Sequence, residues 1–553
     1  MPRSTLAAGL ASTPALAPAL ALALLSGCPG DDPPATDSSS STTGEDSTGS
    51  STADDTSTTD ADGTGTSTTG ELPDPLPPLG AVPTTVDQRI EPTHAVEAQP
   101  LDPRIPDERE QLLEQGFGDH ALGPGEPVEA LTPDGSPPPD PGPSPQLLTR
   151  FVHLADTQVA DDESPLRYVE VDSAFISGAF RPQEAYGCQI TNAAVRTINA
   201  VHARTPLRFV VLGGDNADSA QTNEVQWFLD ILDGAPVVHC DSGSDDDPLP
   251  GEGNDPKDPF APVGLDVPWI WVSGNHDVLV QGNFSIEGRE EDAVGSNVPG
   301  GSSTLDWSQP GAPVFDGPVV PDPARALLDP VALMSLVLDS GDGHGITEDA
   351  LAAGRTTYAW DVPDSALRLV VVDSTALTGD ASGLVTDTDV EQHIRPLLDQ
   401  AEADGKLVMV ATHHASTSLG DGAGIGGPPQ PGALEPADWQ ALLGEYPNVI
   451  AHLAGHSHVH RATYIEPAPG SGYWEIITAA IADWPHQMRI VEVHDQDNGW
   501  LTITGIALDY ATDGDGLAAD GRIRGVLDFT SGWTPDGSGT PQDRNVQLWV
   551  PAP

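Results

Sequence analysis

Five short apolar runs recur along the chain from residue 151 onward, and each has the pattern of a buried strand. They span residues 151–155, 207–212, 267–272, 407–411 and 449–453. Continuous apolar runs of this length are typical of strands that are covered on both faces. Residues 192–202 and 390–403 lie between such runs and have the spacing of helices. Strands that alternate with helices in this way predict an α/β fold.

Weaker patterns predict further elements. Short helices are expected at 106–115 and 322–337, and a last strand is expected at 545–550. The body that starts near residue 147 is large for a single core. The excess lies in two insertions, 241–266 and 283–350. Insertions beside an active site commonly form lids or substrate walls, so we expect specificity to lie there.

The N-terminus has the pattern of an export signal. Residues 1–27 begin with a positive charge, continue with an Ala- and Leu-rich stretch and end just before Cys28. The Leu25–Cys28 ending resembles a bacterial lipobox, which implies cleavage before Cys28 and lipidation of its sulfur. The alternative is an uncleaved membrane anchor, which Pro14 and Pro18 disfavour. We therefore expect an exported lipoprotein of the bacterial cell envelope, periplasmic or on the cell surface.

The segment after the signal is expected to be a tether. Residues 28–80 are rich in Ser, Thr, Asp and Gly and have almost no large apolar side chain, so they cannot offset the entropy of ordering. A flexible chain of this length reaches about 40 Å. Residues 81–146 are Pro-rich and are expected to be mostly extended. Residues 511–553 are expected to form a C-terminal extension that packs on the body that starts near residue 147.

Charge narrows the range of partners. The net charge is −62, and Lys257 and Lys406 are the two lysines. A nucleic-acid-binding protein would have basic stripes, so this class is not expected. Of the three cysteines, Cys188 and Cys240 are left over once Cys28 is lipidated. They can form a disulfide in an oxidising compartment or remain two separate thiols, and sequence spacing leaves both alternatives open.

Polar, metal-competent residues follow each of the five apolar runs. They are Asp156 and Gln158, then Asp215 and Asp218, then Asn275 and His276, then His413 and His414, then His456 and His458. The carboxyl ends of buried strands are where α/β proteins build active sites. Divalent ions bind this mixture of carboxylate, amide oxygen and imidazole. No thiolate occurs in any of the five loops, so a structural zinc finger is disfavoured.

In their order these loops resemble the calcineurin-like metallophosphoesterase superfamily, over roughly residues 147–510. The resemblance implies a four-layer αββα sandwich with two mixed β-sheets and a site for two metal ions. It implies that Asp215 bridges both ions, that Asp156 and His458 hold one, and that Asn275, His413 and His456 hold the other. It also implies that His276 acts near the leaving group and that Asp218 orients it.

The resemblance has one departure. Gln158 stands where the family usually has a histidine, and an amide oxygen is a weaker, neutral metal ligand. The Asp-X-Gln pattern resembles a minority branch of the family. Whether His413 or His414 is the ligand is not settled by spacing, although His413 is favoured because it comes first after the strand.

The implied reaction is hydrolysis of a small-molecule phosphomonoester or phosphodiester. Two cations, of Mn, Fe or Zn, about 3.5–4 Å apart can clamp a phosphoryl oxygen and acidify a bridging water, whose hydroxide attacks phosphorus. A histidine such as His276 is a suitable general acid for the leaving group. One alternative is a catalytically degenerate surface protein that keeps the fold for binding, and Gln158 is the feature that favours it. Another is a metallohydrolase that uses the same metal chemistry on a substrate other than a phosphate ester.

Overall fold

The computed structural model describes residues 74–169, 178–243, 255–296, 303–305, 314–316, 318–341, 344–424 and 427–553. The predicted signal peptide, the predicted lipidation at Cys28 and nearly all of the predicted tether lie outside the described residues. No helix in these described ranges is long and apolar enough to cross a membrane.

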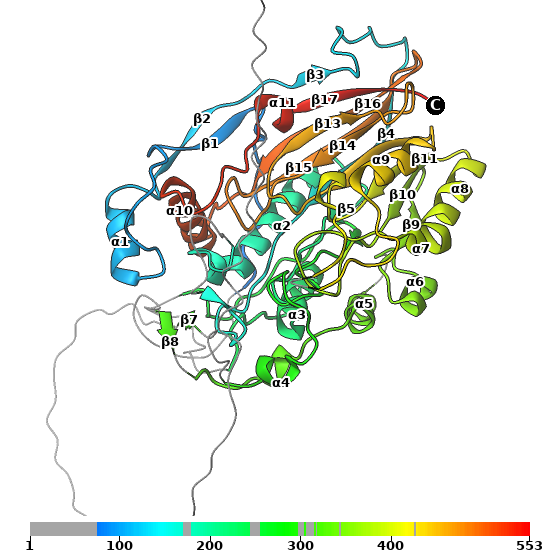
Figure 1. The fold of residues 1–553 in the computed structure, drawn as a ribbon. Coiled ribbons are helices and arrows are strands. Elements are labelled where there is room, and N and C mark those ends of the chain that lie inside the picture. Colours follow the sequence, from blue (N-terminus) through cyan, green and yellow to red (C-terminus); the bar gives the residue numbers. More distant parts are fainter. Residues whose placement is uncertain are drawn as a thin grey trace, which may run out of the picture. The chain divides into compact units, whose positions relative to one another are not determined.

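Two large β-sheets form the centre of the molecule (Figure 1). The six-stranded sheet has the order β13 (Arg461–Ile465), β14 (Tyr473–Ile477), β12 (Val449–Ala454), β11 (Leu407–Ala411), β10 (Leu367–Val371), β9 (Tyr358–Asp361). The seven-stranded sheet has the order β3 (Glu129–Leu131), β17 (Val546–Pro551), β16 (Trp500–Asp509), β15 (Gln487–Asp495), β4 (Gln146–Leu154), β5 (Val210–Leu212), β6 (Trp269–Trp271).

Both sheets are mixed. Strands β10, β11, β12 and β14 run parallel, with antiparallel β9 and β13 at the two edges. Strands β4, β5 and β6 are parallel to one another, whereas β4, β15, β16 and β17 pair in antiparallel fashion. All five predicted strands are therefore present, and each lies in the parallel part of its sheet.

The alternation of side chains along β11 shows how the layers are stacked. Val408 and Val410 pack with the helices α8 (Arg395–Ala403) and α9 (Pro436–Gly444) on the outer face of the six-stranded sheet. Met409 and Ala411 point the other way, into the main core that the two sheets share. Successive residues of a strand face opposite sides, so an apolar run serves both layers.

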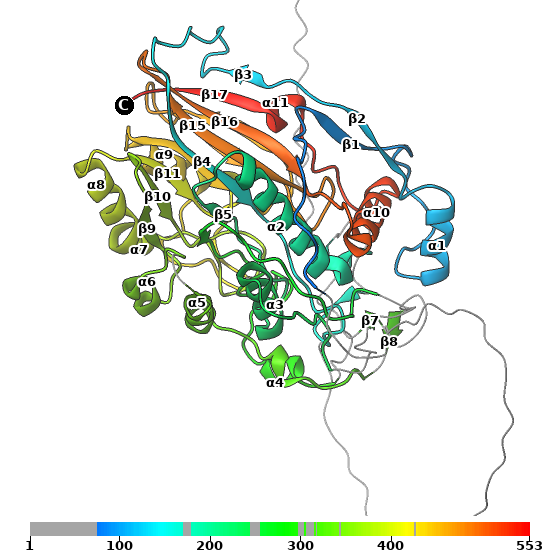
Figure 2. The same cartoon turned by 180° about the vertical axis from the view of Figure 1, so that it is seen from behind.

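Helices α2 (Gly187–Arg204) and α3 (Thr222–Asp233) cover the outer face of the seven-stranded sheet (Figure 2). Helix α10 (Gly516–Thr530) packs against α2. The order of layers is helix, sheet, sheet, helix, so the predicted αββα fold is confirmed. The predicted helices at 192–202 and 390–403 are also present, the second as a π-helical turn Val390–Ile394 followed by α8.

The segment before residue 147 contains more structure than an extended chain. Strands β1 (Gln88–Pro92) and β2 (His120–Pro124) pair with each other, and β3 joins the edge of the seven-stranded sheet. Helix α1 (Pro106–Glu114) lies where a short helix was predicted. The C-terminal residues supply α10, α11 (Pro541–Arg544) and β17, which includes the predicted last strand.

The insertion at 283–350 holds short elements. They are α4 (Glu290–Ala293), the antiparallel pair β7 (Ser303–Leu305) and β8 (Val314–Asp316), α5 (Pro330–Asp339) and the start of α6 (Glu348–Ala353). The first half of the helix predicted at 322–337 is wrong. Asp322 caps a separate 3-10 turn, Pro323–Arg325, and the helix starts only at Pro330. A proline is favoured in the first turn of a helix and disfavoured within it.

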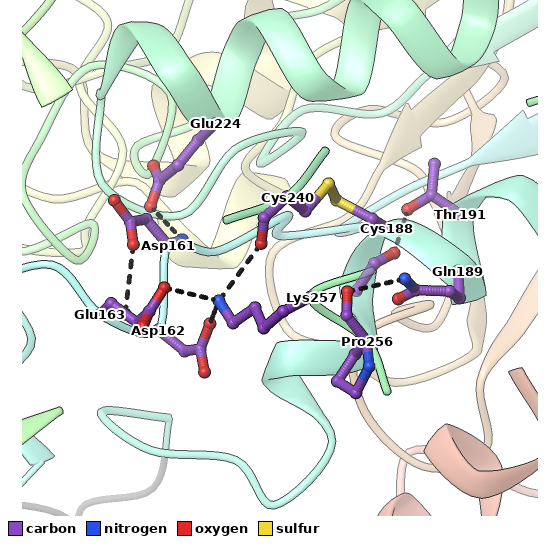
Figure 3. The surroundings of a disulfide bond; sticks show 11 residues. Asp161, Asp162, Glu163, Cys188, Gln189, Thr191, Glu224, Cys240, Pro256 and Lys257 are labelled. Atoms are coloured by element: carbon purple, nitrogen blue, oxygen red, sulfur yellow. Dashed lines mark hydrogen bonds and ion pairs between the residues drawn. A yellow bond between two sulfur atoms is a disulfide. The ribbon is translucent and has the colours of Figure 1, made fainter. Parts of the chain in front are cut away.

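A disulfide ties the other insertion to the body. Cys188 in the first turn of α2 is bonded to Cys240, just before the insertion at 241–266 (Figure 3). Gln189, next to Cys188, donates a hydrogen bond of 2.9 Å to the carbonyl of Pro256 near the end of the insertion. Of the two alternatives that the sequence left open for these cysteines, the structure has the disulfide.

Lys257 is a buried cation beside this disulfide (Figure 3). Its Nζ lies 2.5 Å from Oδ1 of Asp162 and 3.0 Å from Oε2 of Glu163, and it donates a hydrogen bond of 3.2 Å to the carbonyl of Cys240. Burial alone would lower the pKa of Lys257, but the two carboxylates raise it well above its ordinary value, so the lysine stays charged. The insertion is thereby held against the loop that follows Gln158.

Replacing Lys257 with Met should lower the free energy of unfolding by about 3–5 kcal/mol, because it leaves buried carboxylates without a counter-charge. Chemical denaturation of the purified protein measures this. Lys406→Met is the matched control, since the side chain of Lys406 is partly exposed and lies 3.5 Å from Asp361. The free energy of unfolding of Lys406→Met should fall by less than about 1 kcal/mol, as is usual when an exposed ion pair is removed. Equal losses in the two variants would contradict the structural role of Lys257.

Candidate metal centre

The five polar loops meet at one place between the sheets. The loops after β4, β5 and β6 come from the seven-stranded sheet, and those after β11 and β12 come from the six-stranded sheet. Hydrogen bonds join loops of different sheets. Nδ1 of His413 lies 2.9 Å from the carbonyl of Gly213, and the backbone N–H of His456 donates to the carboxylate of Asp156 at 3.0 Å. The predicted site residues are thus brought together by the packing of the two sheets.

The candidate ligand atoms lie close to one another. Nε2 of His413 lies 3.0 Å from Oδ2 of Asp215 and 3.9 Å from Oδ1 of Asp156. Nε2 of His458 lies 3.3 Å from the same Asp156 oxygen. The ligand atoms form two compact groups, Asp156, Asp215 and His413 in one, and His413, His414 and His456 in the other, with all atoms of a group within 4.8 Å.

Four buried polar atoms at this place have no hydrogen-bond partner among the described residues. They are Gln158 Oε1, Asp215 Oδ2, Asn275 Oδ1 and His413 Nε2. Leaving a buried polar group unpaired costs about 1–3 kcal/mol each, so such a cluster needs an explanation. His413 Nε2 and Asp215 Oδ2 are close but not aligned for a hydrogen bond, as two ligands of one cation would be. The donor set of carboxylate, amide oxygen and imidazole fits a metal centre.

Three histidines are oriented by a hydrogen bond from Nδ1. The partner is the carbonyl of Gly213 for His413, the carbonyl of Asp218 for His276 at 2.7 Å, and the Asp483 carboxylate for His458 at 2.6 Å. Fixing Nδ1 leaves Nε2 directed at the site. Metal-binding histidines are commonly held in this way by a second oxygen.

The geometry distinguishes His413 from His414. Both ring nitrogens of His414 have protein partners, the Ser374 hydroxyl at 2.9 Å and the Ala381 carbonyl at 3.1 Å. Burial and the neighbouring His456 lower the pKa of His414 well below its ordinary value, so this ring is neutral. For His413, burial alone would lower the pKa, but Asp215 raises it to about 9.

The backbone is strained at five candidate ligands. Asp156, Gln158, Asp215, His456 and His458 all have positive φ, between 41° and 65°. The left-handed region costs roughly 1–2 kcal/mol per residue for an L-amino acid with a side chain. Residues held in sparsely populated conformations cluster at active sites, where the surrounding structure enforces them. This concentration of strain supports a functional role for the loops.

Asp277 holds two of the loops together, a role that the sequence did not reveal. Its carboxylate accepts hydrogen bonds from the backbone N–H groups of Asp215, Asn216, Ala217 and Gly274, at 2.8–3.0 Å. Gly274 must be a glycine, because a Cβ there would lie 2.1 Å from Oδ1 of Asp215. The sequence feature that could have indicated this role is the Gly-Asn-His-Asp motif itself. Its last residue, Asp277, positions the other loop residues instead of binding a metal ion.

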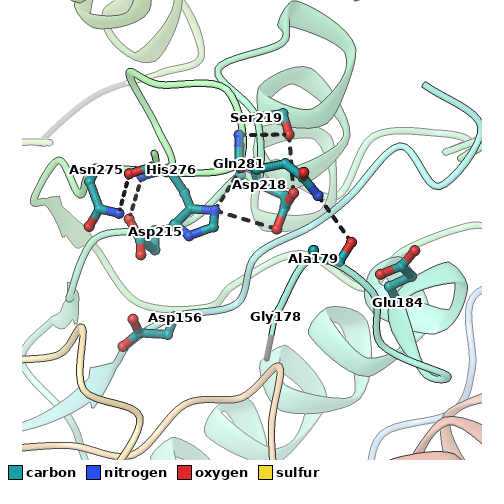
Figure 4. Close-up of polar contacts among 12 residues, drawn as sticks. Asp156, Gly178, Ala179, Glu184, Asp215, Asp218, Ser219, Asn275, His276 and Gln281 are labelled. Atoms are coloured by element: carbon teal, nitrogen blue, oxygen red, sulfur yellow. Dashed lines mark hydrogen bonds and ion pairs between the residues drawn. The ribbon is translucent and has the colours of Figure 1, made fainter. Parts of the chain in front are cut away.

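His276 and Asp218 lie together as predicted (Figure 4). Besides the Nδ1 hydrogen bond, an Asp218 carboxylate oxygen lies 3.4 Å from the ring of His276. Burial alone would lower the pKa of His276, but Asp215 and Asp218 raise it, which favours a protonated ring. Asp218 also forms a buried ion pair with Arg167. Arg167 is thus structural and not available to bind a phosphate.

The site opens into a cavity of about 680 Å³. Candidate ligands and His276 line one part of it, and the rest includes two sets of residues that the sequence did not predict. One is Asp483, which orients His458 and also accepts a hydrogen bond from Arg181 at 2.7 Å. The other is the segment 534–537 of the C-terminal extension. Neither carries a recognisable motif, and only the folded chain brings them to the site.

Comparisons with known proteins give distant likenesses. No family model matches the chain, and no curated protein matches it. Among solved structures, it is similar to a dimetal phosphatase from Danio rerio, with 14% identity, a TM-score of 0.37 and coverage of 66% of this chain and 100% of the other. It is also similar to a purple acid phosphatase from yellow lupin, with 12% identity, a TM-score of 0.31 and coverage of 70% of this chain and 54% of the other. A third similar structure is the sulfate thiohydrolase SoxB of Thermus thermophilus, with 12% identity, a TM-score of 0.28 and coverage of 71% of this chain and 61% of the other.

Replacing Asp483 with Asn should weaken the binding of one metal ion by about 10–100-fold, because His458 loses the carboxylate that orients it. Calorimetric titration of the metal-free protein with metal ions measures the affinity for each ion. Asp497→Asn is the control, since Asp497 is exposed and follows the end of β15, whereas Asp483 precedes the start of that strand. Unchanged affinity for both ions in Asp483→Asn would contradict the role of Asp483.

Proposed function

We propose that this protein is a metal-dependent phosphoesterase that hydrolyses phosphomonoesters or phosphodiesters. The observation that carries the proposal is the cluster of four buried candidate ligand atoms that have no hydrogen-bond partner among the described residues, on loops from both sheets. A binding protein that had lost its metals would gain stability by pairing or replacing such atoms. The positions of His276 and Asp218 beside the cluster add a reason to favour turnover over binding alone.

The residues divide between two metal positions. We assign Asp156, Gln158 and His458 to one ion, Asn275, His413 and His456 to the other, and Asp215 to both. Gln158 fits this role, since its side-chain oxygen is buried and unpaired among the described residues. The departure from the family pattern is therefore a change of ligand, not the loss of one. Mn, Fe or Zn suits this mixture of oxygen and nitrogen ligands.

When bound, two such ions would polarise the phosphoryl oxygens and lower the pKa of a coordinated water. The protein's own residues complete the chemistry. His276 faces the cavity, and the hydrogen bond from its Nδ1 leaves Nε2 to donate a proton to the leaving oxygen. Asp218 holds the ring in place and favours its protonated form. Arg167, paired with Asp218 and Glu184, fixes Asp218 in turn.

The proposal includes export of the protein to the cell envelope. The Cys188–Cys240 disulfide supports it, because disulfides persist in oxidising compartments. Anchoring through Cys28 is part of the same proposal and rests on the sequence alone, as does the absence of a nucleic-acid partner.

The test is metal content together with hydrolysis, measured on one sample. The protein purified without its N-terminal 73 residues should bind two metal ions per chain and hydrolyse mono- or bis-(p-nitrophenyl) phosphate with added manganese, iron or zinc. Hydrolysis should disappear when the metals are removed by a chelator and return when they are restored. Fewer than two ions and no turnover with any metal would favour the degenerate binding protein.

Replacing His276 with Asn should leave two metals bound and slow the hydrolysis of alkyl phosphate esters by about 10²–10⁴-fold, because the leaving alkoxide then lacks its proton donor. Esters of p-nitrophenol should be much less affected, since that leaving group needs little protonation. The ratio of kcat values for the two ester types, in variant and wild type, measures the effect. An equal loss for both types would contradict the role of His276 as general acid.

A further inference from the structure

The segment Thr534–Gly537 is fixed against the metal centre. The backbone N–H of His460 donates a hydrogen bond of 2.9 Å to the carbonyl of Gly537. A Cβ on Gly537 would lie 2.2 Å from the carbonyl oxygen of His458 and 2.6 Å from that of Trp484, so the segment is in close contact with both loops. The hydroxyl of Thr534 donates to the carboxylate of Asp528 at the end of α10. These contacts hold the segment Thr534–Gly537 in place as one wall of the cavity.

The charges that line the cavity are unevenly distributed. Among the described lining residues, Arg181 is the one lysine or arginine. It is buried and already paired, with Asp483 at 2.7 Å and Asp218 at 3.6 Å. Asp536, on the Thr534–Gly537 wall, is exposed, and one of its oxygens accepts a hydrogen bond of 2.9 Å from the N–H of Ser538. Away from the metal positions, the cavity offers a carboxylate and no available cation in its described part.

Two aromatic side chains line the same cavity, Trp484 and Phe284. Trp484 is held by stacking on Phe529, with ring centroids 5.3 Å apart and planes within 4° of parallel. Phe284 is held by an edge contact with Tyr168 at 5.2 Å, and the guanidinium of Arg289 lies 5.4 Å from its centroid. Aromatic faces attract cations, so aromatic walls suit a positively charged group.

We propose that this part of the cavity binds a positively charged alcohol group of the substrate, such as a quaternary ammonium or amino alcohol. Asp536 supplies the counter-charge, and Trp484 and Phe284 supply the aromatic walls. This inference rests on the proposed phosphoesterase function and names its substrate class. Nucleotides and polyphosphates are disfavoured, because a second phosphate would meet Asp536 and no free cation among the described lining residues. The net charge of −62 acts in the same direction at long range.

A matched pair of diesters tests the proposal with the metal-loaded protein. One is p-nitrophenyl phosphocholine, and the other is its neutral isostere, 3,3-dimethylbutyl p-nitrophenyl phosphate, which has the same shape without the positive charge. We expect kcat/KM to be roughly tenfold higher for the charged ester, as for a partly desolvated cation beside a carboxylate and aromatic rings. Added salt should reduce this preference, since it screens exposed charges.

Asp536→Asn should bring the ratio of the two kcat/KM values close to one, because the positively charged ester then loses its counter-charge and with it its advantage over the neutral ester. Asp497→Asn, also an exposed carboxylate, should keep the wild-type ratio. A wild-type ratio of one or less, or an unchanged ratio in Asp536→Asn, would overturn the inference while the phosphoesterase function stands.

Failure of both esters to react would instead count against the phosphoesterase function. The inference is then tested by calorimetry of choline binding to the metal-loaded protein. Binding that is lost in Asp536→Asn and kept in Asp497→Asn would support the cationic subsite. Absence of binding to the wild type, or equal binding to all three proteins, would overturn it.

Discussion

The need to balance buried charge is the constraint on which this site depends. Asp156, Asp215, Asp218 and Asp483 all lie at loops where the strands end, with little or no exposure to solvent. A buried carboxylate without a counter-charge costs several kcal/mol. Arg167 and Arg181 balance Asp218 and Asp483. Among the described residues, histidines are the groups that can balance Asp156 and Asp215, an arrangement that is consistent with the binding of cations from outside the chain.

The fold meets this constraint by placing loops from two sheets face to face. Neither sheet holds the complete set of candidate ligands, since the candidate carboxylates come from one sheet and the candidate histidines from the other. The interface between the sheets is secured away from the site, where Tyr358 donates a hydrogen bond of 2.5 Å to the carbonyl of Trp271 and Trp474 one of 2.9 Å to that of Trp549. The packing of the two sheets therefore also assembles the site. Substitutions that disrupt the core between the sheets should also displace the residues of the site.

Segments outside the two central sheets complete the surroundings of the site. The disulfide and Lys257 hold an insertion against the loop after Gln158, and residues 511–553 supply both the strand β17, which lies between β3 and β16, and a wall of the cavity. Specificity was expected in the insertions. The cavity as described is lined at least as much by the C-terminal extension, which lies outside the region that resembles the metallophosphoesterases. Loops and terminal segments vary more readily than buried strands, so they are suited to adapting one chemistry to a particular substrate.

The sequence by itself determined the five strands, the α/β class and the identity of the residues that meet at the strand ends, because apolar runs and the polar residues that follow them are local patterns. The αββα order of layers was implied by the resemblance of the five loops to a known family. It did not determine which of His413 and His414 points into the site, the pairing of Cys188 with Cys240, or the part played by Asp277 and Asp483. These depend on contacts between segments far apart in the chain, such as Asp483 with His458 or Gly537 with His460. Only tertiary packing decides which of several chemically suitable side chains are close enough to interact.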